Sequence, residues 1–302
     1  MPRRPSFRQE LTLPKDLHSS STHRDFSRRD FVRASIGSGF AAAVLPVTAQ
    51  TVIKTDSVGL LAGEVVIGVG DFKLPAYRAA PLGRANPPVV LVISEVFGVH
   101  EYIADVARRL AKQGYFAIAP ELFVRQGDPG AYGEIGKLLS EVIAKVPDAQ
   151  VMADLDATVA WARGQGADTS KLGINGFCWG GRIAWLYAAH NPGLKAAVAW
   201  YGRLTGQKSA MNPAHPLDLA AKFQAPVLGL YGGQDTGIPL ESVDRMKAAL
   251  ALGSDAARQS SLVVFPEAPH AFHADYRASY RQNAADDAWQ RCLAWLKIQG
   301  VV

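Results

Sequence analysis

Nearly continuous apolar runs alternate along this chain with segments whose apolar residues recur at helical spacing. Six of the runs are short, which is typical of strands that a parallel sheet buries on both faces. These runs are Val89–Ser94, Tyr115–Ala119, Leu172–Asn175, Ala196–Tyr201, Pro226–Tyr231 and Leu262–Phe265. Upstream of them, Glu64–Val69 and Phe72–Ala79 flank Gly70-Asp71, and this order predicts a β-hairpin.

Helices are predicted in several of the intervening segments. In Tyr102–Gln113 four apolar residues share one face, and Gly114 suits the C-terminal cap. Further helices are predicted at Ala153–Arg163, Arg182–His190, Met246–Leu250 and Asp286–Lys297. The apolar spacing of the last helix predicts that Cys292 lies on its buried face as a small core residue.

Strands that alternate with helices favour right-handed βαβ units. We therefore expect an α/β fold with a mostly parallel sheet, covered by helices on both faces. Residues 50–302, about 250 in number, suit one domain with a large core. With only two cysteines, the chain does not resemble a disulfide scaffold.

The first 49 residues read as a separate segment. Ser27-Arg28-Arg29-Asp30-Phe31-Val32 resembles a twin-arginine export signal, and the apolar run Ile36–Val47 and the small-residue site Val47-Thr48-Ala49 follow it. The run is too short for a stable membrane anchor, which takes about 20 apolar residues. We expect a signal peptide over residues 1–49, the twin-arginine export machinery as its partner, and a periplasmic or secreted protein exported folded. A disordered basic tail is the alternative.

The charge distribution agrees with this division. Residues 1–49 hold eight of the 32 Lys and Arg residues and four of the 27 Asp and Glu residues, so most of the net charge of +5 lies there. The rest of the chain has no basic stripe and no interleaving of basic and aromatic residues, which argues against a nucleic-acid partner.

The sequence Gly176-Phe177-Cys178-Trp179-Gly180-Gly181 lies between a predicted strand and a predicted helix. This is the context of a nucleophile elbow, here with Cys at the nucleophile position. Glycines suit such a turn because side chains would crowd it. A helix N-terminus also favours a thiolate. By itself the motif also fits a glycine-rich turn around a buried Cys.

Four chemically useful side chains follow buried strands: Glu95, Cys178, Asp235 and His270. Catalytic groups collect at the carboxyl ends of such strands, and the order nucleophile, acid, histidine is that of α/β-hydrolases. His270 would pair with the thiolate and protonate the leaving group, and Asp235 would orient the imidazole. The backbone N–H groups of Trp179 and Val96 are the expected oxyanion hole.

Each candidate has another interpretation. Asp235 could cap the helix near Glu241, His270 could be a loop histidine, and Glu95 could be a surface carboxylate. His270 and His273 also form an H-x-x-H pair near Asp275, but no further ligand pair is evident, so no metal is expected. A redox-sensing thiol would require Cys178 to pair with Cys292.

The chain resembles the dienelactone hydrolase family from about Glu64 to Lys297. The resemblance is carried by Ser94-Glu95-Val96-Phe97-Gly98, Gly114-Tyr115-Phe116-Ala117-Ile118-Ala119-Pro120, the elbow, Trp200-Tyr201-Gly202, Gly232-Gly233-Gln234-Asp235 and Ala268-Pro269-His270-Ala271-Phe272. It implies an α/β-hydrolase fold, no cofactor, a triad of Cys178, Asp235 and His270, and a Glu95 that hydrogen-bonds the resting thiol and accepts its proton when substrate binds.

The chain departs from the family at the arginines that hold a substrate carboxylate. Ala274 stands where one of them follows the catalytic His, and residues 128–150 contain no arginine. Arg125, Arg182 and Arg203 are the possible substitutes, of which Arg125 and Arg203 are predicted to bind substrate. An apolar pocket is predicted from four aromatic residues, with core packing as the alternative: Phe97, Trp179, Tyr201 and Phe272.

The expected activity is hydrolysis of small esters or lactones through a Cys178 acyl-enzyme. An enol-lactone that bears a carboxylate is the favoured substrate class. A general carboxylesterase or thioesterase is the second possibility, and a non-catalytic binding protein on the same fold is the third.

Overall fold

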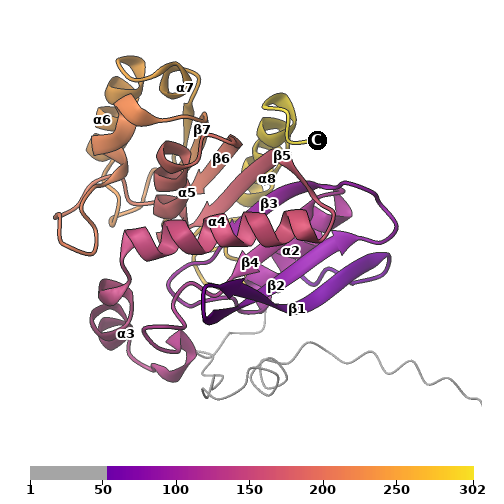
Figure 1. Cartoon of the computed structure of the whole chain (residues 1–302). Coiled ribbons are helices and arrows are strands. Elements are labelled where there is room, and N and C mark those ends of the chain that lie inside the picture. Colours follow the sequence, from indigo (N-terminus) through magenta and orange to yellow (C-terminus); the bar gives the residue numbers. More distant parts are fainter. Residues whose placement is uncertain (1–52) are drawn as a thin grey trace, which may run out of the picture.

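The structure is a computed structural model that describes residues 53–302 (Figure 1). Its sheet has eight strands in the order β1-β2-β4-β3-β5-β6-β7-β8. The strands are β1 (Leu60–Val69), β2 (Phe72–Pro81), β3 (Pro88–Ile93), β4 (Phe116–Pro120), β5 (Asp168–Phe177), β6 (Leu194–Trp200), β7 (Val227–Gly232) and β8 (Ser261–Phe265). β2 pairs antiparallel with β1 and β4, and the other neighbours are parallel.

Seven α-helices and three short 3-10 segments connect the strands in the described part of the chain. The helices are α2 (Glu101–Lys112), α3 (Ile135–Glu141), α4 (Asp148–Gly164), α5 (Trp179–His190), α6 (Leu240–Ala251), α7 (Asp255–Arg258) and α8 (Gln282–Ile298). The 3-10 segments are η1 (Pro129–Ala131), η2 (Ile143–Lys145) and η3 (Pro216–Lys222).

The helices cover both faces of the sheet, as the sequence predicts. The chain moves one way along the sheet from β3 to β4 and the other way from β5 to β6. Right-handed crossovers therefore place α2 and α5 on opposite faces. Figure 1 shows α4 in front of the sheet and α8 behind it. All six residues of β3 are buried, which explains why that strand reads as a continuous apolar run.

The predicted elements are confirmed, with differences at their ends. The hairpin closes with Val69 opposite Phe72, so Gly70-Asp71 forms its turn. The helix after the elbow begins at Trp179 rather than at Arg182, because the two glycines at positions 180 and 181 already have helical geometry. The helices α3 and α7, and the 3-10 segments, are not predicted, because they are too short to show a periodicity.

The connections that leave β3 and β5 run toward opposite sides of the sheet, although the two strands themselves are parallel. After β3 the chain goes to β4 on one side, and after β5 it goes to β6 on the other side. In open parallel sheets a crevice forms outside the carboxyl ends of two such strands. Glu95 follows β3 and Cys178 follows β5, so two of the predicted site residues lie at this switch point.

Missing side chains let α5 lie close to the ends of β3 and β6. A Cβ at Gly180 would touch the carbonyl oxygen of Ile93 and lie 2.6 Å from that of Ser94. A Cβ at Gly181 would lie 2.6 Å from the carbonyl oxygen of Trp200. The start of the helix can therefore rest directly on backbone, which no larger residue would permit.

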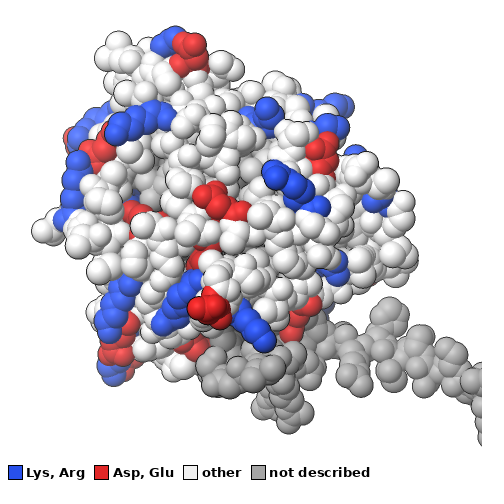
Figure 2. All heavy atoms as spheres, viewed as in Figure 1, with Lys and Arg blue, Asp and Glu red and all other residues white. Residues whose placement is uncertain are grey.

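The described surface and helices bear on two further sequence predictions. Figure 2 shows Lys and Arg residues interspersed with Asp and Glu on the face in view. None of the helices within residues 53–302 is long and apolar enough to cross a membrane. The predicted signal peptide, residues 1–49 with its cleavage site after Ala49, lies outside the described residues.

Replacement of Gly180 by Ala should destabilise the protein, because the new Cβ would meet two backbone carbonyls that cannot move away. We expect a loss of about 1–3 kcal/mol in the free energy of unfolding, measured by urea denaturation. Gly136→Ala is the matched control, since a Cβ there meets no atom within 4 Å and α3 is helical. Equal stability of the two variants would contradict the close-contact explanation.

Candidate active site

Cys178 lies in a strained turn between β5 and α5. Its backbone angles are φ 55° and ψ −111°, in a region that non-glycine residues rarely adopt. The turn is held by the Cys178 N–H, which donates to the carbonyl of Trp200 at 2.9 Å, and by the Gly180 N–H, which donates to the carbonyl of Ser94 at 3.1 Å. The half-buried thiol therefore lies at the N-terminus of α5, beside the ends of β3 and β6.

The structure brings His270 and Asp235 to this thiol. His270 Nε2 lies 3.3 Å from Cys178 Sγ, and His270 Nδ1 lies 2.7 Å from Asp235 Oδ2. The three residues follow β5, β7 and β8, and the structure brings their side chains together at one edge of the sheet. The imidazole side chain is 36% exposed, whereas the Asp235 carboxylate is 1% exposed.

Two partners change the protonation of His270. Burial by itself lowers its pKa, but the hydrogen bonds and charges of Asp235 and Cys178 outweigh that effect and raise the pKa to about 10. The imidazolium is therefore the favoured form at neutral pH in this arrangement. An imidazolium beside the sulfur stabilises a thiolate.

Asp235 does not cap α6, which was the alternative for this residue. That helix begins at Leu240 after Pro239 and has no side-chain cap. Instead, Asp235 Oδ1 accepts the N–H groups of Gly237 at 2.9 Å and Ile238 at 3.2 Å. One carboxylate oxygen thus fixes the turn after β7, and the other holds His270.

The two backbone groups of the expected oxyanion hole are available for a ligand. Neither the Val96 N–H nor the Trp179 N–H donates a hydrogen bond to any of residues 53–302. Both residues are half-buried and flank the contact between Ser94 and Gly180. The Trp179 ring lies against Phe123, with the ring centroids 4.6 Å apart.

Glu95 is completely buried, but it does not hydrogen-bond the thiol in this structure. Its Oε2 lies 3.1 Å from His100 Nε2, and its Oε1 accepts the Tyr276 hydroxyl at 3.2 Å. The alternative of a surface carboxylate is therefore wrong. The contact with the resting thiol that the family resemblance implies is absent here, because His270 is the thiol's partner and Glu95 has turned to His100 and Tyr276.

His273 does not join His270 in a metal site. It is buried, and its Nδ1 is hydrogen-bonded to the Tyr102 hydroxyl at 2.6 Å. Burial, assisted by the charge of Arg109, lowers its pKa well below the usual value and keeps the ring neutral. The two histidines thus face different partners.

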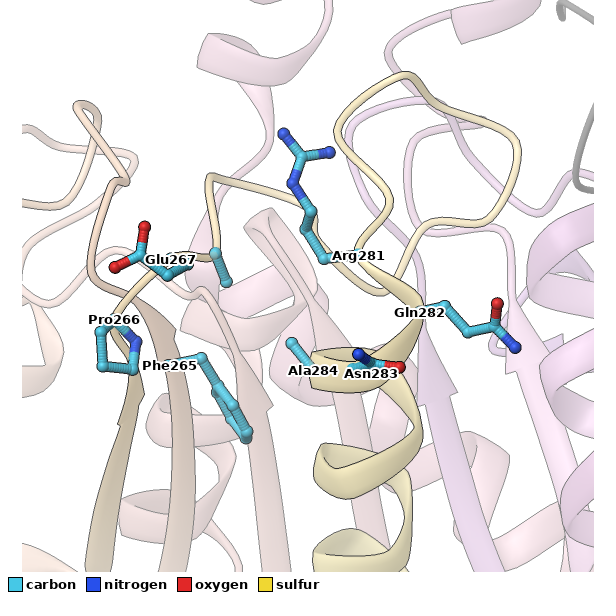
Figure 3. A pocket seen from close by; sticks show the side chains of 8 residues that line it. Phe265, Pro266, Glu267, Arg281, Gln282, Asn283 and Ala284 are labelled. Atoms are coloured by element: carbon cyan, nitrogen blue, oxygen red, sulfur yellow. The ribbon is translucent and has the colours of Figure 1, made fainter.

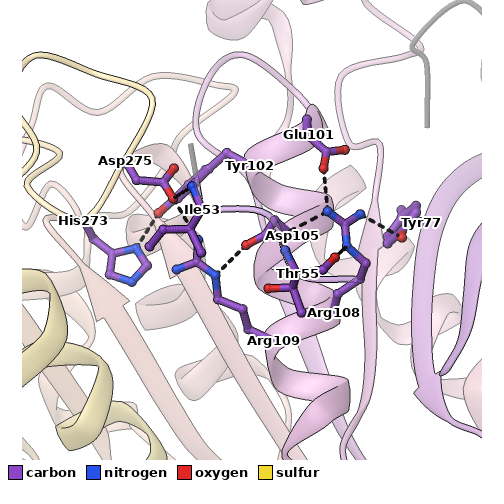
Figure 4. Close-up of polar contacts among 10 residues, drawn as sticks. All are labelled: Ile53, Thr55, Tyr77, Glu101, Tyr102, Asp105, Arg108, Arg109, His273 and Asp275. Atoms are coloured by element: carbon purple, nitrogen blue, oxygen red, sulfur yellow. Dashed lines mark hydrogen bonds and ion pairs between the residues drawn. The ribbon is translucent and has the colours of Figure 1, made fainter. Parts of the chain in front are cut away.

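Asp275 anchors the loop that carries His270 (Figure 4). Its Oδ2 accepts Arg109 Nη2 at 2.8 Å and the Ile53 backbone N–H at 3.0 Å. Arg109 Nε in turn donates to Asp105 Oδ2 at 2.5 Å, and Asp105 Oδ1 accepts the Thr55 backbone N–H at 2.5 Å. This buried network joins the loop to α2 and to the first residues of the described chain.

Arg125 is not available for substrate, which corrects the prediction made for it. Its guanidinium forms a bidentate ion pair with Asp154 at 2.5 and 2.8 Å and lies 3.9 Å from the centre of the Phe72 ring. Arg182 is likewise paired with Asp148 at 2.7 and 2.8 Å. Arg203 is exposed and forms no ion pair within the described chain.

Arg277 is a candidate that the sequence interpretation missed. Its guanidinium lies 5.6 Å from the centre of the Phe97 ring and forms no ion pair with residues 53–302. Its positive charge also acts on the hydroxyls of Tyr201 and Tyr276, where it opposes the rise in pKa that burial and the charge of Glu95 cause. The sequence feature that could have identified Arg277 is its position seven residues after His270, in the same loop.

The four aromatic residues divide into two groups. Phe97 and Trp179 are half-buried at the site. Phe272 is completely buried against Phe265 and Tyr201, at centroid distances of 5.1 and 5.5 Å, so its prediction as a substrate contact is wrong and the core-packing alternative holds. It supports Tyr201 from behind.

Tyr201 is completely buried as well, so its prediction as a substrate contact is wrong on the same ground as that of Phe272. Its ring meets that of His270 edge-on at 5.1 Å, and its φ of 39° is in the left-handed region. Burial, and then the charges of Glu95 and Cys178, raises the pKa of its hydroxyl well above the usual value. A neutral hydroxyl therefore lies within electrostatic range of both groups.

Cys292 is a core residue, as predicted. It is completely buried on α8, and its Sγ lies 3.7 Å from Asn175 Oδ1. Burial raises the pKa of its thiol. Both cysteines are free in the structure, so it contains no disulfide between Cys178 and Cys292.

A separate hollow lies between the end of β8 and the start of α8 (Figure 3). Phe265 and Pro266 form one side, and Gln282 to Ala284 form the other. Figure 3 shows Glu267 and Arg281 at its rim. None of the predicted triad residues lines it, so this hollow is distinct from the thiol site.

Comparison with known proteins identifies the family of this chain. The model of the family described as "Dienelactone hydrolase family" matches residues 74–299. A protein of Methylorubrum extorquens named "Putative carboxymethylenebutenolidase" is 58% identical over 287 residues, which cover 95% of this chain and 98% of that protein. A protein of the same name from Escherichia coli K12 is 53% identical and covers 87% and 96%.

A solved structure gives the same result. The "Putative Dienelactone Hydrolase" of Klebsiella pneumoniae is 55% identical to this chain and superposes with a TM-score of 0.77, over 79% of this chain and 98% of that chain. The fold is thus that of an α/β-hydrolase, and the protein is a hydrolase of this kind. The chain belongs to the dienelactone hydrolase family.

Proposed function

We propose that this protein hydrolyses small lactones or esters through a Cys178 acyl-enzyme. The observation that supports this proposal is the continuous chain from Cys178 Sγ to His270 Nε2 at 3.3 Å and from His270 Nδ1 to Asp235 Oδ2 at 2.7 Å. Nucleophile, acid-base group and orienting carboxylate are connected in the order that acyl transfer requires.

In the first half of the reaction, the Cys178 thiolate attacks the substrate carbonyl. The new C–S bond moves an electron pair onto the carbonyl oxygen, and the N–H groups of Val96 and Trp179 bind the resulting oxyanion. When the oxyanion collapses, the bond to the leaving oxygen breaks, and the His270 imidazolium protonates that oxygen. With a lactone the leaving oxygen remains attached to the acyl group.

In the second half, neutral His270 accepts a proton from water, and the hydroxide equivalent attacks the thioester. Collapse of the second tetrahedral intermediate breaks the C–S bond and releases the carboxylic acid. The thiolate and the imidazolium are then restored. Asp235 stabilises the imidazolium in both halves and fixes which ring nitrogen faces the sulfur.

Glu95 is proposed to accept the proton of the thiol when the ion pair forms. The family resemblance assigns this role to Glu95, and the pKa of about 10 at His270 belongs to the ion pair that results, because the charge of Cys178 contributes to it. The Glu95 charge acts on the same Tyr201 hydroxyl as Cys178 does, which supports its proximity to the sulfur. The arrangement in this structure, in which the Glu95 carboxylate faces His100 and Tyr276, would then represent the activated site.

For the substrate, we propose a lactone with an anionic group held by Arg277. The names of the relatives from Methylorubrum extorquens and Escherichia coli point to a butenolide that carries a carboxylate. Arg277 supplies a cation that forms no ion pair with residues 53–302, lies next to Phe97 and acts on the hydroxyls of Tyr201 and Tyr276. A carboxylesterase or thioesterase with neutral substrates is the second candidate, and the ion pairs that occupy Arg125 and Arg182 favour it.

We also propose that the protein acts outside the cytoplasm. This proposal depends on residues 1–49 alone.

Cys178→Ala should lower kcat by at least about 1,000-fold, for a dienelactone and for a p-nitrophenyl ester alike. The measurement is steady-state hydrolysis by purified protein. The control is Cys292→Ala, which removes the buried thiol away from the site and should keep kcat per folded molecule. Turnover that survives Cys178→Ala would rule out the acyl-enzyme. Activity on the aryl ester alone would favour the second candidate.

His270→Gln should change how alkylation of Cys178 by iodoacetamide depends on pH. In the wild type the imidazolium persists up to about pH 10 and holds the thiolate, so the rate should fall little between pH 8 and pH 6. In the variant the rate should fall about tenfold per pH unit below about 8.5, as for a free thiol. Identical pH profiles would contradict the ion pair. His190→Gln, at an exposed histidine on α5, is the control.

Arg277→Gln should raise KM about 10- to 100-fold for a carboxylate-bearing lactone, because a charge-assisted hydrogen bond contributes about 1.5–3 kcal/mol. Hydrolysis of a neutral aryl ester should change less than about threefold. Arg203→Gln is the matched comparison, since Arg203 is an exposed arginine that forms no ion pair with residues 53–302. If that variant loses carboxylate selectivity and Arg277→Gln keeps it, the assignment belongs to Arg203 instead.

A further inference from the structure

The buried Glu95 carboxylate depends on two partners. It has no exposed surface, and in the described chain it accepts hydrogen bonds from His100 at 3.1 Å and from Tyr276 at 3.2 Å. A buried carboxylate needs such partners because loss of hydration is costly. Neither bond directs Glu95 to Cys178, whose sulfur faces His270 instead.

His100 is firmly fixed at the start of α2. Its carbonyl accepts the Ala104 N–H at 3.0 Å, and its own N–H donates to the Gly98 carbonyl at 3.1 Å. The ring lies over Tyr102 at a centroid distance of 5.9 Å and meets Tyr276 edge-on at 4.9 Å. These contacts direct Nε2 to Glu95, and the side chain remains 14% exposed.

The position of Glu95 matters for the thiol because the two groups share an environment. Glu95 follows Ser94, whose carbonyl accepts the Gly180 N–H of the Cys178 elbow at 3.1 Å, and both charges act on the hydroxyl of Tyr201. A carboxylate turned to Cys178 would accept the S–H as a hydrogen bond and oppose a second negative charge on the sulfur. The thiol would then stay protonated and away from His270.

We propose that His100 is a positioning residue that holds the Glu95 carboxylate away from Cys178 and so leaves the thiolate to His270. The inference rests on the proposed function and adds a residue to it. Without the His100 hydrogen bond, the buried carboxylate keeps only the Tyr276 hydroxyl, and the Cys178 thiol becomes the substitute donor. His100 thereby determines how much of the thiol is reactive.

The other titratable groups around this pair do not provide the same control. Burial raises the pKa of Tyr102 and of Tyr276, so both phenols stay neutral. Tyr201 is neutral for the same reason. Arg277 acts electrostatically on Tyr276 but forms no ion pair with Glu95. The hydrogen bond from the His100 imidazole to Glu95 is therefore the one that the test variants remove.

The test is the rate of Cys178 alkylation by iodoacetamide between pH 6 and pH 9, in the full chain, for the wild type and three variants. His100→Phe keeps a ring but removes the donor and should slow alkylation about tenfold at pH 7, with the pH profile moved about one unit higher. His100→Gln can place an N–H near the position of Nε2 and should recover most of the loss. Glu95→Gln with His100→Phe should also recover it, since the carboxylate charge is gone.

Wild-type alkylation rates in His100→Phe would overturn the proposal, as would an equal loss in the double variant. If His100→Phe does not fold, as judged by its thermal unfolding, His100→Asn replaces it: this side chain is too short to reach Glu95 and should show the same shift. Alkylation needs no substrate. A protein that fails to hydrolyse lactones would contradict the proposed function and leave this test intact.

Discussion

The site depends on the close approach of the N-terminus of α5 to the ends of β3 and β6. Three glycines make this approach possible, since a Cβ at Gly180, Gly181 or Gly202 would collide with backbone. The resulting hydrogen bonds from Cys178 to Trp200 and from Gly180 to Ser94 fix the elbow from both sides. Because the connections from β3 and β5 leave toward opposite sides of the sheet, this contact lies at a switch point, where open parallel sheets generally bind their ligands.

Two carboxylate–imidazole pairs occur among the residues of the site. Asp235 pairs with His270, which contacts the sulfur, and Glu95 pairs with His100, which does not. Both carboxylates are buried, so each one needs a fixed donor. The different orientation of the two pairs gives similar chemical groups different proposed tasks: the first stabilises the thiolate, and the second keeps a competing negative charge away from it.

The loop between β8 and α8 carries several of these groups at once: His270, Tyr276 and Arg277. Its fixed point is Asp275, which Arg109 on α2 and the backbone of Ile53 bind in the interior. The described chain therefore begins with a segment that packs against the loop of the site. Membership of the dienelactone hydrolase family explains the shared fold and elbow. The arginine arrangement of this chain distinguishes its proposed substrate contacts from those implied by the resemblance.

The sequence by itself determined the elements and the chemistry that follow from local pattern. Apolar runs gave the strands, helical spacing placed Cys292 in the core, and the strand ends identified Cys178, Asp235 and His270, because parallel strands bring their carboxyl ends together. Only the tertiary structure decided which side chains are free. Arg125 is bound to Asp154, and Phe272 supports Tyr201 from the core. Arg277 forms no ion pair within the described part of the chain, and Glu95 faces His100. These outcomes depend on contacts between residues far apart in the chain, which neither periodicity nor spacing can encode.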